Sequence, residues 1–249
     1  MPRVFIGYDS RETLAYEVCR RSLLRHCPDA YVTPLRQDNL RRAGLYRRAF
    51  WSDDGQRYDS QDGRPFSTEV SFSRFLVPML GVAEDADWVL FCDSDFLFRE
   101  SVSDLFDLAE DRYAVQVVKH DYKTKAARKY LGNKNENYPR KNWSSLILWN
   151  CAHPANRQLT PELVQGSTGA FLHRFSWLPD ELIGELPLEW NWLESEYAAK
   201  PEAPLIHYTL GTPCFAEYAA TDTAHLWWDS CGRVMQGLDT PALPKVVGL

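Results

Sequence analysis

An apolar run that ends in two carboxylates is the feature that most constrains this chain. Trp88–Cys92 has the length and composition of a buried strand, and Asp93 and Asp95 follow it at once. Because the carboxyl ends of strands in an open α/β sheet face the ligand crevice, we expect both acids there. Side chains two positions apart in an extended segment point to the same side, so the pair can hold one divalent cation.

Other interpretations of these acids have to be weighed. A second pair, Asp85 and Asp87, precedes the same strand at its amino end, away from the expected crevice, and we interpret it as a solvated turn. For Asp93 and Asp95 the alternative is a loop whose acids cap the next helix. The buried strand before them and the apolar residues after them favour the metal site.

Composition limits the functions open to the chain. Its 249 residues are 45% hydrophobic, which is enough for one large domain, and a net charge of -6 argues against nucleic-acid binding. No Cys-x-x-Cys pair suggests zinc, and several cysteines lie in apolar runs, as buried thiols do. The start of the chain turns polar too early for a signal peptide, and no apolar run approaches the ~18 residues of a membrane span. We therefore expect a cytoplasmic protein without a transmembrane segment.

The start of the chain has the pattern of a strand, a helix and a second strand. Val4–Gly7 is a short apolar run, and Ser10 is the expected N-cap of a helix that ends near Cys27. Tyr31–Pro34 is the expected second strand. This order predicts an α/β fold with a Rossmann-like, doubly wound, mostly parallel sheet and helices on both faces.

Two residues at the end of the first strand are candidates for nucleotide contact. Tyr8 could stack on a base, and Asp9 could accept hydrogen bonds from a base or a ribose. A purely structural turn is an equally good interpretation of both residues.

The next segments are predicted to be a loop and a helix. Residues 36–64 are polar and turn-rich, which predicts an excursion or mobile loop, and arginine pairs such as Arg47 and Arg48 are interpreted as a solvated face. Ser67–Leu80 has the spacing of a helix with a broad apolar face, and it includes Arg74. We expect Arg74 to have a fixed anionic partner, either a ligand diphosphate or a site acid. An arginine whose head reaches solvent is the alternative.

A basic cluster follows the strand expected at Tyr113–Val118. It runs from Lys119 to Lys141, with tyrosines between its lysines and arginines. Such a cluster could contact an anionic acceptor, a membrane surface or substrate phosphates, and a solvated helix and loop is the commoner explanation.

The second half predicts two further strands and a terminal helix. The strands are expected at Ser144–Asn150 and Pro204–Tyr208, and the helix at residues 223–235. His207 leaves its strand into a loop rich in Gly and Pro, from which it could close a site. A satisfied core histidine is the alternative.

Together these segments resemble the GT-A type nucleotide-sugar glycosyltransferases, and above all the retaining glycosyltransferase family eight. The resemblance covers most of the chain as a series of short motifs. The motifs are Val4–Asp9 (first nucleotide-binding strand), Ser71–Leu76 (arginine helix), Leu90–Asp95 (Asp-x-Asp strand), Trp143–Asn150 (sugar-pocket strand), Leu186–Asn191 (Leu-Pro-x-x-Trp-Asn) and His207–Pro213 (closing loop).

The resemblance implies a metal-dependent enzyme that moves a sugar from a nucleotide-diphosphate sugar to an acceptor, with retention. It implies Mn²⁺, or Mg²⁺, held by Asp93, Asp95 and His207, and UDP-sugars are favoured over GDP-sugars as donors. The acceptor, whether glycan, lipid-linked or protein, stays open. The residues expected to contact the nucleotide sugar are Tyr8, Asp9, Arg74, Ser94, Gly211 and Thr212.

The chain departs from the family pattern in three places. Trp143 stands where the family has asparagine, and residues 166–169 read Gly-Ser-Thr-Gly where it has Asp-Gln-Asp. The closing loop lacks the lysine that grips the diphosphate. Backbone N–H groups of Gly211 and Thr212 are expected to replace that lysine.

We expect a single GT-A type catalytic domain over residues 1–249. Its nucleotide-binding half would span 1–118 and its acceptor- and sugar-binding half 119–249. Two alternatives stay open: a non-catalytic sugar-nucleotide or glycan-binding protein of the same fold, and a sugar nucleotidyltransferase. A Gly-rich loop bearing Lys or Arg after the first strand would favour the nucleotidyltransferase, and Gly7–Ser10 is not such a loop.

Overall fold

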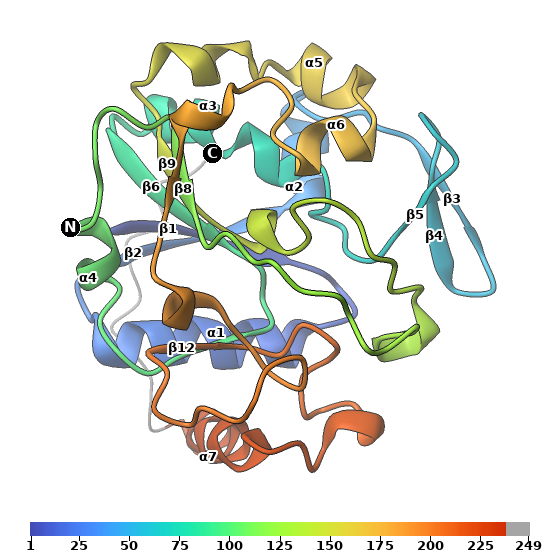
Figure 1. Ribbon diagram of the computed structural model, residues 1–249, viewed down its shortest axis with the longest axis vertical. Coiled ribbons are helices and arrows are strands. Elements are labelled where there is room, and N and C mark those ends of the chain that lie inside the picture. Colours follow the sequence, from blue (N-terminus) through green and yellow to red (C-terminus); the bar gives the residue numbers. More distant parts are fainter. Residues whose placement is uncertain (238–249) are drawn as a thin grey trace.

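A six-stranded sheet forms the centre of the computed structural model, which describes residues 1–237 (Figure 1). In the order β10-β8-β9-β6-β1-β2, its strands are Ile183–Glu185, Val115–Val117, Leu146–Asn150, Trp88–Cys92, Arg3–Tyr8 and Tyr31–Arg36. β1 pairs in parallel with β2 and β6, and β8 with β10, whereas β9 runs antiparallel to both of its neighbours. The expected α/β fold with a mostly parallel sheet is confirmed.

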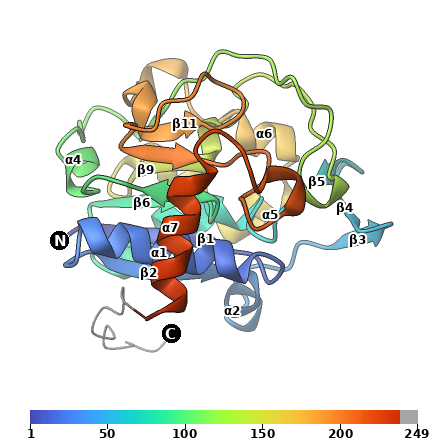
Figure 2. The same cartoon turned by 90° about the horizontal axis from the view of Figure 1, so that it is seen from below.

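Helices cover both faces of this sheet (Figure 1). One face carries α2 (Gln37–Arg42), α3 (Val77–Ala83), α5 (Pro161–Gly166) and α6 (Gly169–His173). The other carries α1 (Thr13–His26) and α4 (Ser103–Phe106), and α7 (Ala224–Met235) packs against α1 (Figure 2). None of the helices within residues 1–237 is long and apolar enough to cross a membrane.

Two-sided burial explains why β6 is apolar at nearly every position. Val89 and Phe91 pack into the core beneath α3, while Leu90 and Cys92 pack into the core beneath α1. All four side chains are fully buried. Strands covered on both faces read as continuous apolar runs, and the acids therefore begin where the strand leaves the core.

A second, three-stranded sheet lies beside the first and joins distant parts of the chain. It contains β11 (Trp192–Leu193), β12 (Leu205–His207) and β7 (Phe96–Phe98), with β12 antiparallel to β7. In this register His207 lies opposite Phe96, the residue that follows Asp95. Backbone pairing thus fixes the position of the late histidine relative to the acidic pair.

Residues 36–64 are more ordered than the sequence predicted. They form α2 and most of a third sheet, made of β3 (Phe50–Asp53), β4 (Gln56–Asp59) and β5 (Pro65–Phe66). The solvated-face interpretation is wrong for Arg48, whose guanidinium is buried and pairs with Asp59 at 2.5 and 2.8 Å. A buried carboxylate partner allows an arginine to leave water, and such a partner cannot be seen in local sequence.

Two predicted helix boundaries are wrong. Ser10 is not an N-cap: α1 begins at Thr13, and the Ser10 hydroxyl donates to Glu69 instead. The helix predicted over Ser67–Leu80 is an α-helix only from Val77, after a 3-10 turn. Pro78 has no N–H to bond the carbonyl four residues back, so it is favoured in a first helical turn.

Asp9 ties the third sheet to the end of β1. Its carboxylate is 1% exposed and accepts hydrogen bonds from Arg57 (2.7 Å), the Arg11 backbone N–H (2.9 Å) and the Glu69 backbone N–H (3.0 Å). Burial acts to raise the pKa of Asp9, but these hydrogen bonds outweigh it, and the pKa lies below its ordinary value of 3.8. The carboxylate is therefore a structural anchor.

Asp9→Asn should destabilise the fold by about 3 kcal/mol at pH 7, because it removes the nearer and more deeply buried of the two carboxylates that pair with Arg57. A carboxyl with a lowered folded-state pKa contributes stability above its unfolded pKa and loses it as pH falls through the folded one. The gap between wild type and variant should therefore narrow below about pH 4, as measured by urea unfolding from pH 3 to 7. Asp53→Asn, at an exposed position, is the control. A gap that is the same at every pH would contradict this account.

Candidate functional site

The segment between β6 and β7 holds the acidic pair in a fixed backbone conformation. The Asp93 N–H donates to the Ser145 carbonyl at 2.9 Å, and the Asp95 carbonyl accepts from the Tyr208 N–H at 2.9 Å. One acid is thus anchored to the start of β9 and the other to the end of β12.

A hydrogen bond and a stacking contact fix the orientation of the His207 ring toward Asp95. Its Nε2 lies 3.3 Å from Asp95 Oδ1, and its Nδ1 lies 2.8 Å from the Asn191 side-chain oxygen. The ring is 2% exposed and stacks on Phe96, with 4.2 Å between ring centroids. Because an amide oxygen only accepts, Nδ1 carries a proton, and Nε2 turns toward the carboxylate. Asn191 in turn donates to Ser145, which fixes the orientation of its amide.

This geometry suits a cation between the two side chains. Asp95 Oδ1 is buried and accepts no hydrogen bond within residues 1–237. Unless the ring gains a second proton, a carboxylate oxygen and an imidazole lone pair face one another at 3.3 Å. A metal-binding histidine usually gives its other N–H to an acceptor, as His207 does to Asn191. Asp95 and His207 therefore fit two ligand positions of a divalent cation.

Asp93 has a different partner. Arg74 Nη2 and Nη1 lie 2.8 and 2.9 Å from its two carboxylate oxygens, and Arg74 also donates to the Ser144 carbonyl at 2.7 Å. Of the partners considered for Arg74, the structure therefore selects a site acid. Among residues 1–237, no three His, Cys, Asp or Glu side chains are close enough to hold a metal as they stand. The triad Asp93, Asp95 and His207 stays a prediction.

The pKa values of the two acids shift in opposite directions because their neighbours differ. Burial raises the pKa of Asp93, with Arg74 opposing the rise and Asp95 adding to it. Burial also acts to raise the pKa of Asp95, but the charge of a protonated His207 ring and that of Lys129 act in the opposite direction, and with both charges present the pKa lies below its ordinary value.

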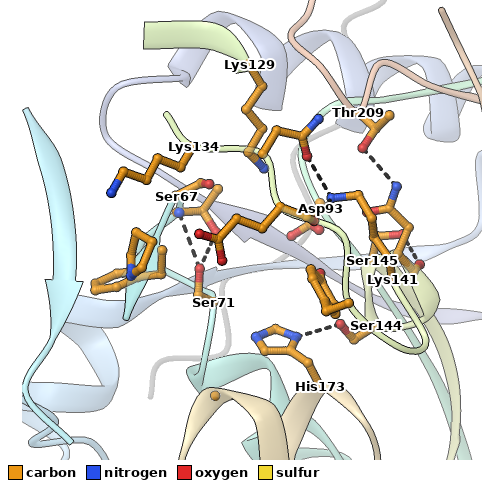
Figure 3. A pocket seen from close by; sticks show the side chains of 18 of the residues that line it. Ser67, Ser71, Asp93, Lys129, Lys134, Lys141, Ser144, Ser145, His173 and Thr209 are labelled. Atoms are coloured by element: carbon orange, nitrogen blue, oxygen red, sulfur yellow. Dashed lines mark hydrogen bonds between the residues drawn. The ribbon is translucent and has the colours of Figure 1, made fainter. Parts of the chain in front are cut away.

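A pocket of about 500 Å³ opens over these residues, between the ends of β6, β9 and β12 and the loop after β8 (Figure 3). Of the predicted site residues, it brings together Asp93, Ser94, Asp95, Arg74 and His207. Its other walls come from β5 and from the region where the family's Asp-Gln-Asp element was expected. Those lining residues include Pro65, Phe66, Ser67, Ser71, Thr168, Gly169 and His173.

Four predicted contacts lie outside this lining: Tyr8, Asp9, Gly211 and Thr212. The guanidinium carbon of Arg36 lies 3.6 Å from the centroid of the Tyr8 ring. The Asp9 carboxylate is bound by Arg57 and Arg11. The Gly211 N–H already donates to the Tyr208 carbonyl, so it is not free to replace the missing lysine. A direct nucleotide contact by these four residues stays a prediction that the pocket does not support.

Lysines from the basic cluster line the pocket instead (Figure 3). Within residues 1–237, Lys129, Lys134 and Lys141 form no ion pair with a carboxylate. Lys141 is 8% exposed and donates to Asn135 at 2.7 Å, and burial lowers its pKa to about 8. Burial also lowers the pKa of Lys129, against the pull of nearby acids. The sequence showed the cluster but not which lysines turn inward.

Glu12 is a lining residue that sequence reasoning missed. It is 4% exposed, its Oε2 accepts from the Tyr130 hydroxyl at 2.9 Å, and its Oε1 has no hydrogen-bond partner within residues 1–237. Burial, together with the charges of Asp95 and Asp9, raises the pKa of Glu12 to about 8. At neutral pH this carboxyl is mostly protonated. A lone glutamate before a helix gives no signal of such burial.

A serine and a histidine also meet in the pocket (Figure 3). Ser144 Oγ lies 2.7 Å from His173 Nδ1. Burial, with Arg74 and Arg48 nearby, lowers the pKa of His173 to about 3, so the ring is neutral. The neutral ring can accept a hydrogen bond from the Ser144 hydroxyl, which leaves the lone pairs of the serine oxygen free to accept from a ligand hydroxyl.

Solved glycosyltransferases share this fold. The bifunctional glycosyltransferase WbbM aligns with 94% of this chain at a TM-score of 0.61 and 14% identity, and this chain spans half of its length. GlyE of Streptococcus pneumoniae aligns over the whole chain, covering 67% of its own length, at a TM-score of 0.57 and 13% identity. The galactosyltransferase LgtC, solved with donor and acceptor sugar analogues, aligns over 98% of both chains at a TM-score of 0.54 and 13% identity.

Sequence comparison identifies a nearer relative. No protein-family model matches the chain. Protein CDI of Arabidopsis thaliana is 44% identical over 231 residues, which cover 90% of this chain and 84% of that protein. At this identity and coverage the two proteins share ancestry as well as fold, and the chain belongs to the same family as Protein CDI.

Proposed function

We propose that this protein is a glycosyltransferase that moves a sugar from a nucleotide-diphosphate sugar to an acceptor. The observation that carries the proposal is the meeting of Asp95 and His207 in a pocket lined by lysines that form no ion pair within residues 1–237. The fold shared with LgtC, GlyE and WbbM supports the reaction class. Membership of family eight, retention, and UDP rather than GDP as the nucleotide rest on the sequence resemblance.

The chemical demand is the charge that develops on the departing diphosphate. Mn²⁺ or Mg²⁺ held by Asp95 and His207, with Asp93 as the expected third ligand, would supply Lewis-acid stabilisation of that charge. Asn191 keeps Nε2 of His207 turned toward Asp95, and Arg74 holds Asp93 in place. These contacts reduce the reorganisation that the site needs when a charged ligand binds.

Lysines from another loop can supply the positive charge that the closing loop does not, because that loop lacks the family's lysine. Lys129 and Lys141 line the pocket and have no carboxylate partner in the part of the chain that the structure describes, so their ammonium groups can bind phosphate oxygens. Both come from the loop after β8 and not from the segment after His207. We propose that they contact the diphosphate, and that backbone N–H groups of Gly211 and Thr212 do not.

Glu12 and the pair Ser144–His173 supply neutral hydrogen-bonding groups. A protonated Glu12 can donate from its free oxygen, and Ser144 can accept, which suits the hydroxyl groups of a ribose or sugar.

The six cysteines are free, and five of them are buried, which agrees with a reducing compartment such as the cytoplasm.

A non-catalytic sugar-nucleotide-binding protein is the second candidate. It is favoured by the engagement of Asp93 with Arg74, which occupies an expected metal ligand. Metal-dependent release of UDP or GDP from a panel of nucleotide sugars would support the enzyme. Binding without release would support the second candidate.

Asp95→Asn should abolish the Mn²⁺-dependent part of the thermal stabilisation given by UDP or GDP. The amide keeps the shape of the side chain but loses the charge that a cation needs. Asp87→Asn, from the acidic pair at the other end of β6, is the matched control and should behave as wild type. Unchanged Mn²⁺-dependent stabilisation in the Asp95 variant would contradict the metal site.

Lys141→Met should weaken binding of UDP about tenfold while leaving uridine binding nearly unchanged, because only the diphosphate needs the ammonium charge. Since the pKa of Lys141 is near 8, UDP affinity of the wild type should fall as pH rises from 7 to 9. Titration calorimetry measures both effects, with Lys123→Met in the same loop as control. Equal losses for UDP and uridine would show that Lys141 acts only through the fold.

Glu12→Gln should become more stable relative to wild type as pH rises from about 4.5 to 8. A carboxyl with a raised folded-state pKa contributes stability below its unfolded pKa and loses it as pH rises through the folded one. The slope should be on the order of 1 kcal/mol per pH unit. Urea unfolding at several pH values tests this, with Glu162→Gln, at an exposed position, as control. A stability difference that does not change with pH would show that the pKa of Glu12 is the same in the folded and unfolded states, which would contradict this prediction.

A further inference from the structure

The third sheet projects from the body of the molecule (Figures 1 and 2). It carries two aromatic rings that stack on one another, those of Trp51 and Tyr58. Trp51 of β3 pairs with Tyr58 of β4, and Tyr58 pairs with Pro65 of β5. Directly paired residues point to the same face of a sheet, so the three rings form one row. Trp51 and Tyr58 stack with 5.5 Å between centroids and 14° between planes, and Trp51 is 48% exposed.

This row runs into the pocket. Pro65, at its inner end, is a lining residue of the pocket, and so is Lys134. The Lys134 backbone N–H donates to Gln56 at 3.1 Å, and its ammonium lies 5.9 Å from the centroid of the Tyr58 ring. The half-buried Tyr58 ring and the exposed Trp51 ring are therefore a continuation of the pocket wall.

The opposite face of the same sheet is anchored to the body. Arg57 precedes Tyr58 and so points the other way, where it pairs with Asp9 at 2.7 Å and with Glu69 at 3.3 Å. These ion pairs are mostly buried, with 11% of the Arg57 side chain exposed. The row of rings is held at a fixed place beside the pocket mouth.

The chemistry of the row fits a carbohydrate. Flat aromatic faces bind the C–H faces of sugar rings, while polar neighbours bind the hydroxyl groups. Lys134 and Gln56 supply such neighbours, and Asp53, which pairs with Gln56 on the same face of the sheet, is exposed and polar. An apolar protein partner would be expected to need a wider apolar patch than two rings.

We propose that Trp51 and Tyr58 form an acceptor subsite that stacks a sugar ring of a glycan whose reacting end enters the pocket. This proposal rests on the proposed function, because it assigns the acceptor of the same reaction. The class of acceptor is then an oligosaccharide or a glycan chain that extends outward over β4 and β3.

The test is glycan binding by wild type, Trp51→Ala and Tyr58→Ala on a printed array of neutral and acidic oligosaccharides, with UDP or GDP and Mn²⁺ present. Wild type should bind at least one class of oligosaccharide, and each alanine variant should lose at least tenfold in apparent affinity. Trp51→Phe should keep most of the binding. The control is Trp228→Ala, because Trp228 on α7 is also exposed, at 41%.

A parallel thermal-shift titration with UDP and GDP separates this proposal from the proposed function. Trp51→Ala should keep the nucleotide response of wild type. A wild type that responds to nucleotide but binds no glycan, or a Trp51 variant that binds glycans as wild type does, overturns the subsite alone. A Trp51 variant that loses the nucleotide response also overturns it, because the rings would then serve the donor. A wild type without any nucleotide response counts against the proposed function, whatever the array shows.

Discussion

The pairing of β12 with β7 is the interaction on which the candidate site depends. It places His207 opposite Phe96, and therefore beside Asp95, although the two side chains come from distant parts of the chain. The Phe96 ring stacks on the imidazole of His207, and the hydrogen bond to Asn191 sets the tautomer of that imidazole. A one-residue change in this register would turn His207 to the other face of the small sheet and dismantle the site.

The acidic and the basic side chains of the pocket come from different segments of the chain. The ends of β6 and β12 contribute acids and a histidine, while the loop after β8 contributes lysines that have no carboxylate partner among the described residues. Tyr130 holds that loop in place, since its hydroxyl donates to Glu12 and its N–H donates to the Leu210 carbonyl. One tyrosine thus links the start of α1, the basic loop and the segment after His207. Acids suited to a cation and lysines suited to phosphate meet in one pocket because of it.

Local sequence was sufficient where a feature depends on local burial, and insufficient where it depends on distant partners. The apolar run of β6 predicted both the strand and the position of Asp93 and Asp95, since two-sided burial has a direct signature. The residues alone left the partner of Arg74 open, and the fold selected Asp93. The projecting third sheet was missed because buried arginine–carboxylate pairs organise it, and such pairs leave no periodic pattern. Glu12 was missed, and the burial of Lys141 within the predicted basic cluster was not foreseen, for the same reason: other segments impose the burial.

The central claim is that Asp95 and His207 hold a divalent cation to which a nucleoside diphosphate binds. Calorimetric titration of the wild-type protein with UDP and with GDP, in Mn²⁺ and again in EDTA, tests it most directly. The account predicts that at least one of the two binds in Mn²⁺ and loses most of its affinity in EDTA. Equal affinity in both conditions would contradict it.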